Sequence, residues 1–504
     1  MDNTSSRYSA EQILRFIREK KEDFWNRERE RRPLRLFHEA AKRVPAYKDF
    51  LKKNKVNPDK IKTFRDFQLV PPISKKNYLR QYPLEKLCWD GSLKKPLVWT
   101  STSGSTGEPF YFPRGHALDW EYSILAELFL NNGSLGNQGP TLVIICLGMG
   151  VWIGGLITYQ AFEIAARRTG QPVSIITPGI NKTEIFNALR DLSPNFKKTI
   201  LVGYPPFLKD VIDEAPGEGI NLKRLHIRIL TAAEAYTEKF RDYLAEKAGI
   251  KNVCLDMLNI YGTADIGAMA WETPTTILMR RFAIQNKKLF KEIFSPIEKM
   301  PTLAQYNPLF ITFEAVNEEI ILSGNNMIPL IRYAVGDHGG VFGFNDGIAK
   351  LKKFNIDFEK KAEQNGLSGN IYELPFVYVY ERHDFSIKLY GAIIYTEPIR
   401  EALLHKKISR FITGKFTMLI RFDKRYNQFM EVNIEFRSKV KPKLYLKKLV
   451  TDLIVKHLME RSSEYQNNYS LIPRKVTPKV VFWKYEHPLH FKLGIKQKWV
   501  KGND

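Results

Sequence analysis

The middle of the chain alternates short apolar runs with longer segments whose apolar residues recur at helical spacing. LVIICL, VSIITP, TILVGY and IRILTAA are runs of the first kind, and TEIFNALRDL, FLKDVIDEA and TEKFRDYLAEKAG are segments of the second. Short apolar runs bounded by turn residues are typical of buried strands, and the longer segments are typical of helices. Strands that alternate with helices build layers of mostly parallel sheet covered by helices, so the pattern predicts an α/β fold.

Both ends of the chain carry patterns of their own. Ser9 and Gln12 have the spacing of a capping box, and apolar residues at helical spacing follow, so a helix should begin there. Gly249 is expected to end a helix as its C′ residue. In residues 385–504, strands such as TMLIRF and EVNIEF and a helix near residues 447–458 predict a smaller α+β unit.

One stretch, residues 141–162, carries no charge, and its length raises the question of a membrane span. It contains four glycines and ends in polar residues, so a buried strand, a glycine loop and a packed helix explain it better. The N-terminus lacks the basic-then-apolar order of a signal peptide. Cys88, Cys146 and Cys254 lie far apart, which argues against a disulfide scaffold and a thiolate zinc site. We therefore expect a cytoplasmic protein without a transmembrane segment.

Composition adds an uneven charge to this picture. The 504 residues are 44% hydrophobic and 26% charged, which is typical of a globular protein and excludes disordered, collagen-like and coiled-coil classes. The net charge is +24, and residues 385–504 contribute +15 of it, with 25 Lys and Arg against 10 Asp and Glu. Such a field favours polyanions, whether nucleic acid, an anionic membrane, or small phosphates such as ATP and coenzyme A. A solvated lysine-rich surface explains the same numbers.

Candidate chemistry begins at residues 100–109, TSTSGSTGEP, where most residues are Ser, Thr or Gly between two apolar runs. Backbone N–H groups in a glycine turn can form an anion nest, and hydroxyl groups add donors, which suits a polyphosphate. The segment is not a Walker loop, because Gly-Lys-Ser/Thr is missing. An ordinary Ser/Thr/Gly surface loop has the same composition, so later segments have to support the interpretation.

Three later segments place polar residues at strand ends, where ligands bind in α/β sheets. Residues 232–234, Ala-Ala-Glu, end a predicted strand directly before a helix. Tyr261 closes an apolar run shortly before Asp265; an aromatic ring can stack on a purine, and a carboxylate can hold Mg²⁺ on phosphates. Asp337 ends another strand and can accept both hydroxyls of a ribose. Core packing, a helix cap and a turn are the structural alternatives for these three side chains.

Taken in order, these segments resemble a known set of motifs. TSGSTGEP, AAE, YGTAD and IRYAVGD look like the phosphate loop, the GAE element, the YGxTE or YGxSE element and the RYxxGD element of the acyl-adenylate-forming superfamily. Within it, the chain resembles the phenylacetate-CoA ligase family. Residues 43–80 are similar to the N-terminal helices of that family and its proline, Lys and Leu-Arg region, and residues 381–403 to its GRxDD hinge stretch. The resemblance covers nearly the whole chain.

The resemblance implies two domains with a nucleotide between them. Residues 1–383 would bind ATP and the acid, and residues 384–504 would form a smaller, mobile α+β domain that carries a catalytic lysine. The positions that match ATP- or AMP-binding residues are Ser103, Gly104, Ser105, Thr106, Gly107, Ala233, Glu234, Tyr261, Gly262, Thr263, Asp337 and Arg382.

The remaining site residues also come from the resemblance. Asp265 takes the metal-associated position, Asp384 is the hinge, and the catalytic lysine is expected at Lys496, with Lys492 and Lys498 as alternatives. By position in the family, the acyl pocket should draw on Trp152, Gly154, Tyr204 and Phe207. Their residue types indicate an apolar cavity, although plain core packing explains Trp152 and Phe207 equally well.

The implied function is ATP-dependent activation of a small carboxylic acid to an acyl-adenylate, with Mg²⁺, followed by transfer of the acyl group to coenzyme A. The chain departs from the family at Ala264, where Thr or Ser is usual, at Asp265 in place of Glu, and at Phe385 in place of the second hinge acid. These departures leave the acid and the acyl acceptor open.

Two alternatives therefore remain. One is an adenylate-forming enzyme that passes the acyl group to an amine or an acidic carrier protein, for example in capsule or polysaccharide biosynthesis. The other is a catalytically silent relative that binds polyanions. The basic tail has no recognisable nucleic-acid module, so no specific nucleic acid is expected as a partner. The oligomeric state stays open, a homodimer included.

Overall fold

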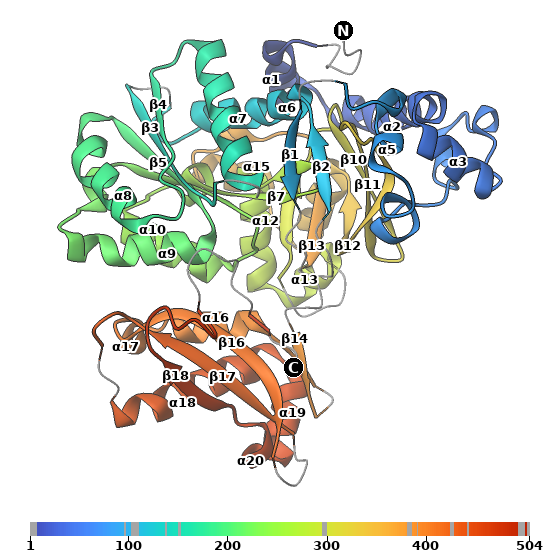
Figure 1. Ribbon diagram of the computed structural model, residues 1–504. Coiled ribbons are helices and arrows are strands. Elements are labelled where there is room, and N and C mark those ends of the chain that lie inside the picture. The colour runs from blue at the N-terminus through green and yellow to red at the C-terminus, as the bar shows by residue number, and fades with distance from the viewer. Residues whose placement is uncertain are drawn as a thin grey trace.

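A computed structural model describes residues 8–94, 97–101, 110–136, 139–149, 153–294, 300–380, 386–390, 392–423, 428–440, 443–491 and 499–500. These residues form a large α/β part up to residue 380 and a smaller part beyond it (Figure 1). An 11-stranded sheet runs through the large part. In spatial order its strands are β10 (Ile311–Val316), β11 (Glu319–Gly324), β12 (Leu330–Phe342), β13 (Phe376–Tyr380), β9 (Thr302–Gln305), β8 (Gly267–Trp271), β7 (Met257–Thr263), β6 (Ile227–Ala232), β5 (Lys198–Gly203), β3 (Thr141–Cys146) and β4 (Val173–Ile176).

One side of this sheet is the predicted parallel α/β layer. β4, β3, β5, β6 and β7 pair in parallel, and helices connect successive strands. The connecting helices are α7 (Ile153–Thr169), α8 (Lys182–Asn187), α9 (Pro205–Glu214), α10 (Glu238–Ala248) and α11 (Val253–Asp256). Gly249 follows α10 with a φ of 77°, a left-handed conformation that glycine adopts without strain, so the predicted helix end is confirmed.

The other side of the sheet is antiparallel. Every pairing from β7 through β8, β9, β13, β12 and β11 to β10 runs in opposite directions. The turn of residues 264–266 between β7 and β8 explains the change, because a short connection joins antiparallel strands while parallel strands need a long crossover. The α/β class is therefore confirmed, and the mostly parallel arrangement holds for one side of the sheet.

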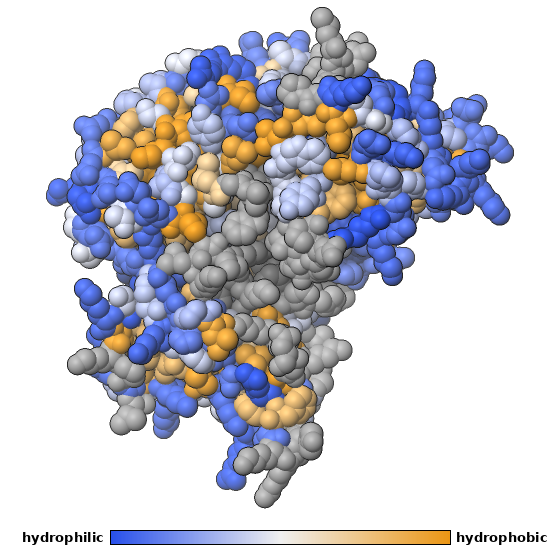
Figure 2. Space-filling model, in the orientation of Figure 1, coloured by the Kyte–Doolittle hydropathy of each residue, from blue (hydrophilic) through white to orange (hydrophobic). Residues whose placement is uncertain are grey.

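The N-terminal segment is helical and forms a β-bridge to the sheet. Ser9 Oγ accepts from the N–H of Gln12, and Gln12 Oε1 accepts from the N–H of Ser9, which confirms the predicted capping box. Further along, Ile73 bridges to Tyr333 of β12. The helices of this segment are α1 (Ala10–Glu19), α2 (Glu22–Arg43), α3 (Pro45–Lys53), α4 (Phe64–Phe67) and α5 (Leu84–Leu87). The surface around α3 is almost entirely hydrophilic (Figure 2).

The remaining elements of the large part frame the sheet. A hairpin of β1 (Val98–Ser101) and β2 (Tyr111–Arg114) leads into α6 (His116–Asn131). Four further helices are α12 (Pro274–Gln285), α13 (Lys287–Ile293), α14 (Phe344–Lys353) and α15 (Phe358–Gln364). The uncharged stretch of residues 141–162 contains β3 and the start of α7, as predicted. Among the described residues, no helix combines the length and the apolar character needed to cross a bilayer.

The smaller part has its own core. The paired strands β14 (Ser386–Leu389) and β15 (Ala392–Tyr395) precede a three-stranded sheet of β16 (Ile412–Phe422), β17 (Gln428–Phe436) and β18 (Lys479–Trp483). Its helices are α16 (Thr396–Leu403), α17 (Lys406–Ser409), α18 (Leu444–Arg461), α19 (Ser463–Leu471) and α20 (Pro473–Val476). The buried residues of this part, from Ile387 to Trp499, form a hydrophobic cluster separate from those of the large part. The expected boundary at residues 383 and 384 lies outside the described residues.

Candidate nucleotide site

Tyr261 and Asp337 meet on neighbouring parts of the large sheet. Tyr261 lies near the end of β7, and Asp337 lies in β12, directly after Gly336. The Tyr261 hydroxyl donates to Asp337 Oδ2 at 2.8 Å, and the Asp337 side chain is largely buried. Two residues predicted for adenine and ribose, 76 positions apart, are therefore held in direct contact.

Asp265 occupies the turn between β7 and β8 and is almost completely buried. Its Oδ2 accepts from the Tyr333 hydroxyl at 2.7 Å, and its Oδ1 lies 3.1 Å from Lys75 Nζ. An anion buried to this degree needs such partners, because an uncompensated buried charge is strongly unfavourable. The sequence analysis gave Lys75 no role, although it lies in the proline, Lys and Leu-Arg region.

The fold explains how Lys75 reaches Asp265 from 190 residues away. Ile73 N–H donates to Arg332 O at 3.0 Å, and Ala334 N–H donates to Ile73 O at 2.8 Å, so the N-terminal segment runs alongside β12. Ser74 then caps the short turn that begins at Lys75. In the sequence, only the Ser-Lys pair that follows two prolines pointed to a role for Lys75. This signal did not show which carboxylate Lys75 contacts.

The Asp265 carboxylate does not resemble a preformed metal cage. Both of its oxygens are engaged by Lys75 and Tyr333. Among the described residues, no group of three or more His, Cys, Asp or Glu side chains could hold a metal ion. Magnesium normally binds through one or two carboxylates together with substrate phosphates. A single carboxylate fits an ion that arrives with the phosphates of ATP, so Asp265 stays the predicted Mg²⁺ contact, although the described residues form no resident metal cage.

Ala233 and Glu234 follow the end of β6. Ala233 has a φ of 75°, a left-handed conformation that turns the chain sharply away from the strand. The Glu234 carbonyl accepts from Asn259 Nδ2 at 3.2 Å, which fixes this turn against β7. The buried Glu234 carboxylate accepts from Trp499 Nε1 of the smaller part at 3.2 Å. The strand-end motif is thus in contact with both parts of the molecule.

Gly262 and Thr263 lie between Tyr261 and Asp265. A Cβ atom at Gly262 would come within 2.5 Å of the Gly267 carbonyl oxygen, so only glycine fits this close approach. Thr263 Oγ1 is buried and makes no hydrogen bond within the part of the chain that the structure describes. A buried hydroxyl of this kind is available to a ligand.

Several predicted site residues lie outside the described residues. They are Ser103, Gly104, Ser105, Thr106, Gly107, Trp152, Arg382, Asp384 and Lys496, together with the alternatives Lys492 and Lys498. The hairpin that flanks residues 102–110 is nevertheless placed. A Cβ atom at Gly267 would lie 3.2 Å from both terminal nitrogens of Arg114 on β2, so this hairpin adjoins the turn that carries Asp265.

The described residues predicted for the acyl pocket pack against different neighbours. Gly154 lies at the start of α7, and an added Cβ there would touch Leu147 at 3.6 Å. Tyr204 packs against the core cluster that includes α6 and α7. Phe207 packs against a different cluster, beneath α9 and α10. Burial raises the pKa of Tyr204, and the Glu234 carboxylate raises it further, so Tyr204 lies near the turn that carries Glu234.

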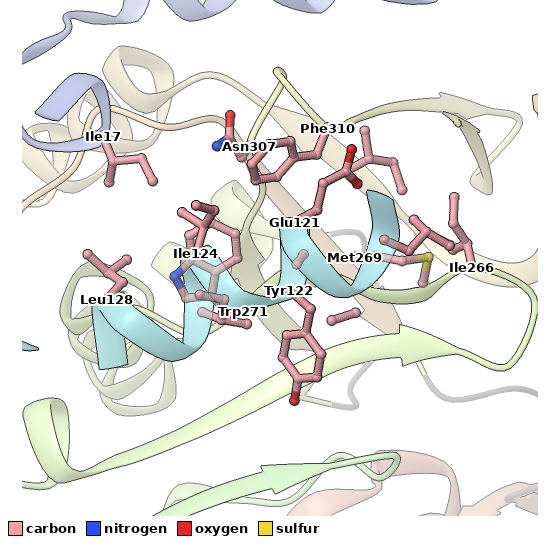
Figure 3. A pocket seen from close by; sticks show the side chains of 15 residues that line it. Ile17, Glu121, Tyr122, Ile124, Leu128, Ile266, Met269, Trp271, Asn307 and Phe310 are labelled. Atoms are coloured by element: carbon pink, nitrogen blue, oxygen red, sulfur yellow. The ribbon is translucent and has the colours of Figure 1, made fainter. Parts of the chain in front are cut away.

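A small cavity lies between α6 and β8 (Figure 3). It holds about 30 Å³ and is mostly apolar, with Tyr122, Met269, Trp271 and Phe310 in its lining. The Glu121 carboxyl group also lines it, and burial raises the pKa of Glu121 to about 8, against the opposing effects of Arg32 and Arg114. Gly154, Tyr204 and Phe207 do not line this cavity.

Solved structures of known proteins resemble the fold of this chain. No protein-family profile matches the chain. It is similar in structure to a 2-hydroxyisobutyryl-CoA ligase in the postadenylation state with 2-HIB-AMP, with a TM-score of 0.62 at 13% identity, over 99% of this chain and 91% of that one. It is also similar to the AtGH3.15 acyl acid amido synthetase in complex with 2,4-DB, with a TM-score of 0.58 at 12% identity, over 98% and 94%. The chain therefore has the fold of the adenylate-forming enzymes.

A sequence comparison is more specific. The chain is 23% identical over 317 residues to the phenylacetate-coenzyme A ligase of Thermus thermophilus, across 61% of this chain. The match spans 64% of that relative, slightly less than two thirds of its length. The resemblance to phenylacetate-CoA ligases that the motifs indicated is thereby confirmed.

Proposed function

We propose that the protein is an AMP-forming ligase that activates a small carboxylic acid with ATP and passes the acyl group to coenzyme A. The observation that carries the proposal is the contact between Tyr261 of β7 and Asp337 of β12 at 2.8 Å, in a protein with the adenylate-forming fold. It joins an aromatic ring suited to a purine with a carboxylate suited to ribose hydroxyls. Thr263 ends the same strand as Tyr261, Asp265 lies on the turn that follows, and Lys75 is paired with Asp265.

In the first step a carboxylate oxygen attacks the α-phosphorus of ATP, the bond to the β-phosphate oxygen breaks, and pyrophosphate leaves. Two anions must meet, so positive charge and fixed geometry are the main requirements. Asp337 would orient the ribose and Tyr261 the adenine. Lys75, paired with Asp265 and 30% exposed, would present its ammonium group to the phosphates. Lys496 is proposed as the group that acts on charge developing in the transition state.

In the second step the thiol sulfur of coenzyme A attacks the acyl carbonyl carbon, the thiol proton is lost, and AMP leaves. We propose that the smaller part moves between the two steps, with its hinge at Asp384. The charge of +15 in residues 385–504 supports coenzyme A as the acceptor, because the cofactor carries several phosphates. We propose that the protein acts in the cytoplasm.

A second acceptor class has an observation in its favour. The structural likeness to an acyl acid amido synthetase, with a TM-score of 0.58, is nearly as strong as that to a CoA ligase at 0.62. Transfer to an amine, or to an acidic carrier protein, is therefore the alternative for the second step.

One screen separates these possibilities. Pyrophosphate release is measured over a panel of carboxylic acids, and AMP release is then measured with and without coenzyme A. The proposal predicts acid-dependent pyrophosphate release and coenzyme-dependent AMP release. Pyrophosphate release with indifference to coenzyme A supports the amine or carrier acceptor. Absence of turnover together with steeply salt-dependent binding to nucleic acid supports the silent, polyanion-binding relative.

A further inference from the structure

The large and smaller parts meet along a defined face. In Figure 1, α16 and β16 lie directly below α9 and α10. Lys209 Nζ on α9 donates to Thr413 O of β16 at 2.6 Å, and Arg437 forms an ion pair with Asp213 of α9 at 2.6 Å. A second ion pair joins Lys415 to Asp210 at 2.6 Å. These buried contacts fix one relative orientation of the two parts.

Beside these ion pairs, Trp499 reaches the strand-end motif of β6. Its indole Nε1 donates to Glu234 Oε2 at 3.2 Å, and only 2% of Trp499 is exposed. The Arg400 guanidinium lies 4.2 Å from the centroid of the Trp499 ring, and Arg400 Nη1 donates to Ala235 O at 3.1 Å. Two residues of the smaller part thus hold Glu234, the last residue of the motif, and Ala235 directly after it. We call Trp499, Arg400 and Glu234 the clasp.

The other side of Trp499 is built into the smaller part. Its carbonyl oxygen accepts from Met418 N–H at 2.7 Å, and its ring centroid lies 5.0 Å from that of Phe416. Trp499 also belongs to the hydrophobic cluster of the smaller part. A rigid rotation of this part would therefore carry Trp499 along and separate its N–H from Glu234. The contact can exist only in one domain orientation.

We propose that Trp499 is a positioning residue for adenylation, which holds the smaller part in the adenylating orientation by binding Glu234. This inference rests on the proposed function and adds a contact that governs the passage from its first step to its second. The Trp499–Glu234 hydrogen bond joins the smaller part to the turn at the end of β6. Its release would then precede the second step.

The chain offers a conservative variant and a matched control. Trp499→Phe keeps an aromatic ring in the core and removes the N–H donor. Trp483→Phe removes an equivalent donor that binds Asn433 Oδ1 at 2.6 Å, entirely within the smaller part. Both variants are checked for folding by circular dichroism and thermal unfolding. A Glu234→Gln variant is added for a double-mutant cycle with Trp499→Phe.

The first readout is structural and needs no turnover. Spin labels at introduced Lys251→Cys and Lys448→Cys, exposed positions on the two parts, report their separation, while the native cysteines at 88, 146 and 254 are buried. We expect a single distance population in the otherwise unaltered protein and in Trp483→Phe. In Trp499→Phe we expect a second population. Distance distributions that coincide in all three proteins would overturn the proposal that Trp499 holds the smaller part in one orientation.

The second readout separates the half-reactions. In Trp499→Phe, kcat for pyrophosphate release should fall about tenfold, the loss expected for one hydrogen bond to a charged group, with the KM for ATP within about twofold. Transfer from preformed acyl-adenylate to coenzyme A should be unchanged or faster, and the effect of Trp499→Phe should be smaller in the Glu234→Gln background, because a neutral amide oxygen accepts the indole N–H more weakly than a carboxylate. Equal loss of both half-reactions would reduce Trp499 to a structural role. If the unaltered protein adenylates no acid, the proposed function fails. The distance measurement still tests independently whether Trp499 holds the smaller part in one orientation.

Discussion

Two groups of predicted site residues are held in different ways. Tyr261, Asp337 and Asp265 contact one another or other residues of the large part at distances of 2.7 to 3.1 Å. Glu234 instead receives a hydrogen bond from Trp499 in the smaller part. The contacts described for the first group, which we call the fixed group, lie within the large part, whereas the Trp499–Glu234 contact of the second depends on domain orientation. A change of domain orientation would therefore break the Trp499–Glu234 contact directly, while the described contacts of the fixed group need not change.

The largest expected effect concerns the fixed group. Asp337→Asn removes the negative charge that would accept two ribose hydroxyls, so the KM for ATP should rise about 100-fold in the pyrophosphate-release assay. Tyr261→Phe removes only the hydroxyl that donates to Asp337 and should raise the KM less than tenfold. Equal and small effects of the two variants would show that Asp337 does not contact the nucleotide.

The next effect concerns the face between the two parts. Arg437→Met leaves the buried Asp213 carboxylate with Lys209 and the Tyr243 hydroxyl, and should lower the free energy of unfolding by about 2 kcal/mol in urea at pH 7. Lys407→Met, at an exposed position of the smaller part, is the control and should change it by less than about 0.5 kcal/mol.

The same pair has a defined pH dependence. Burial alone would raise the pKa of Asp213, but Lys209 and Arg437 outweigh it and hold this pKa below its usual value. A lowered carboxyl pKa stabilises the fold at neutral pH and loses that contribution as pH falls through the lowered value. The stability difference between the unaltered protein and Arg437→Met should therefore shrink in acid. A difference independent of pH would contradict the ion pair.

Lys75→Met tests the fixed group again, with a smaller effect on stability. Asp265 keeps its Tyr333 hydrogen bond but loses its ammonium partner, so the free energy of unfolding should fall by about 1 kcal/mol, because Lys75 is partly exposed and screened. The neighbouring Lys76, which is exposed, supplies the control Lys76→Met with an expected change near zero. If both variants behave alike in thermal unfolding, the Asp265 pair is not formed in solution.

A separate effect, spread over a wide pH range, concerns Glu121 beside the cavity. Its pKa is raised to about 8 by burial, so the folded state holds the proton more tightly than the unfolded state. Stability should then decrease as pH rises from the ordinary glutamate pKa to about 8, with a slope of at most about 1.4 kcal/mol per pH unit. Glu121→Gln should remove this slope in urea unfolding between pH 5 and about 8. An identical slope in the variant would place an ionised Glu121 in the native state.

The sequence predicted those parts of the fold that local patterns determine. The helix start at Ser9 and the helix end at Gly249 depend on nearby backbone groups, and both are confirmed. The antiparallel side of the sheet was not predicted, because its strand order joins β9 to β13 and β8 across long stretches of chain. Hydrophobic alternation reveals a strand but not its neighbour.

The same limit applies to the site. Tyr261 and Asp337 were expected together on the basis of the resemblance, and the structure brings them into contact. The Lys75–Asp265 pair and the Trp499–Glu234 hydrogen bond connect residues 190 and 265 positions apart, and no local pattern encodes either. Phe207 was placed with Tyr204 by position, yet α9 directs it to another hydrophobic cluster.

The central claim is that this chain forms an acyl-adenylate. It is tested most directly by acid-dependent exchange of labelled pyrophosphate into ATP, which detects the reversal of the first step without any acyl acceptor. The account predicts exchange with at least one acid of a broad panel, in the absence of coenzyme A, and strong loss of exchange in Asp337→Asn. A folded protein that binds ATP but supports no exchange with any acid would contradict it.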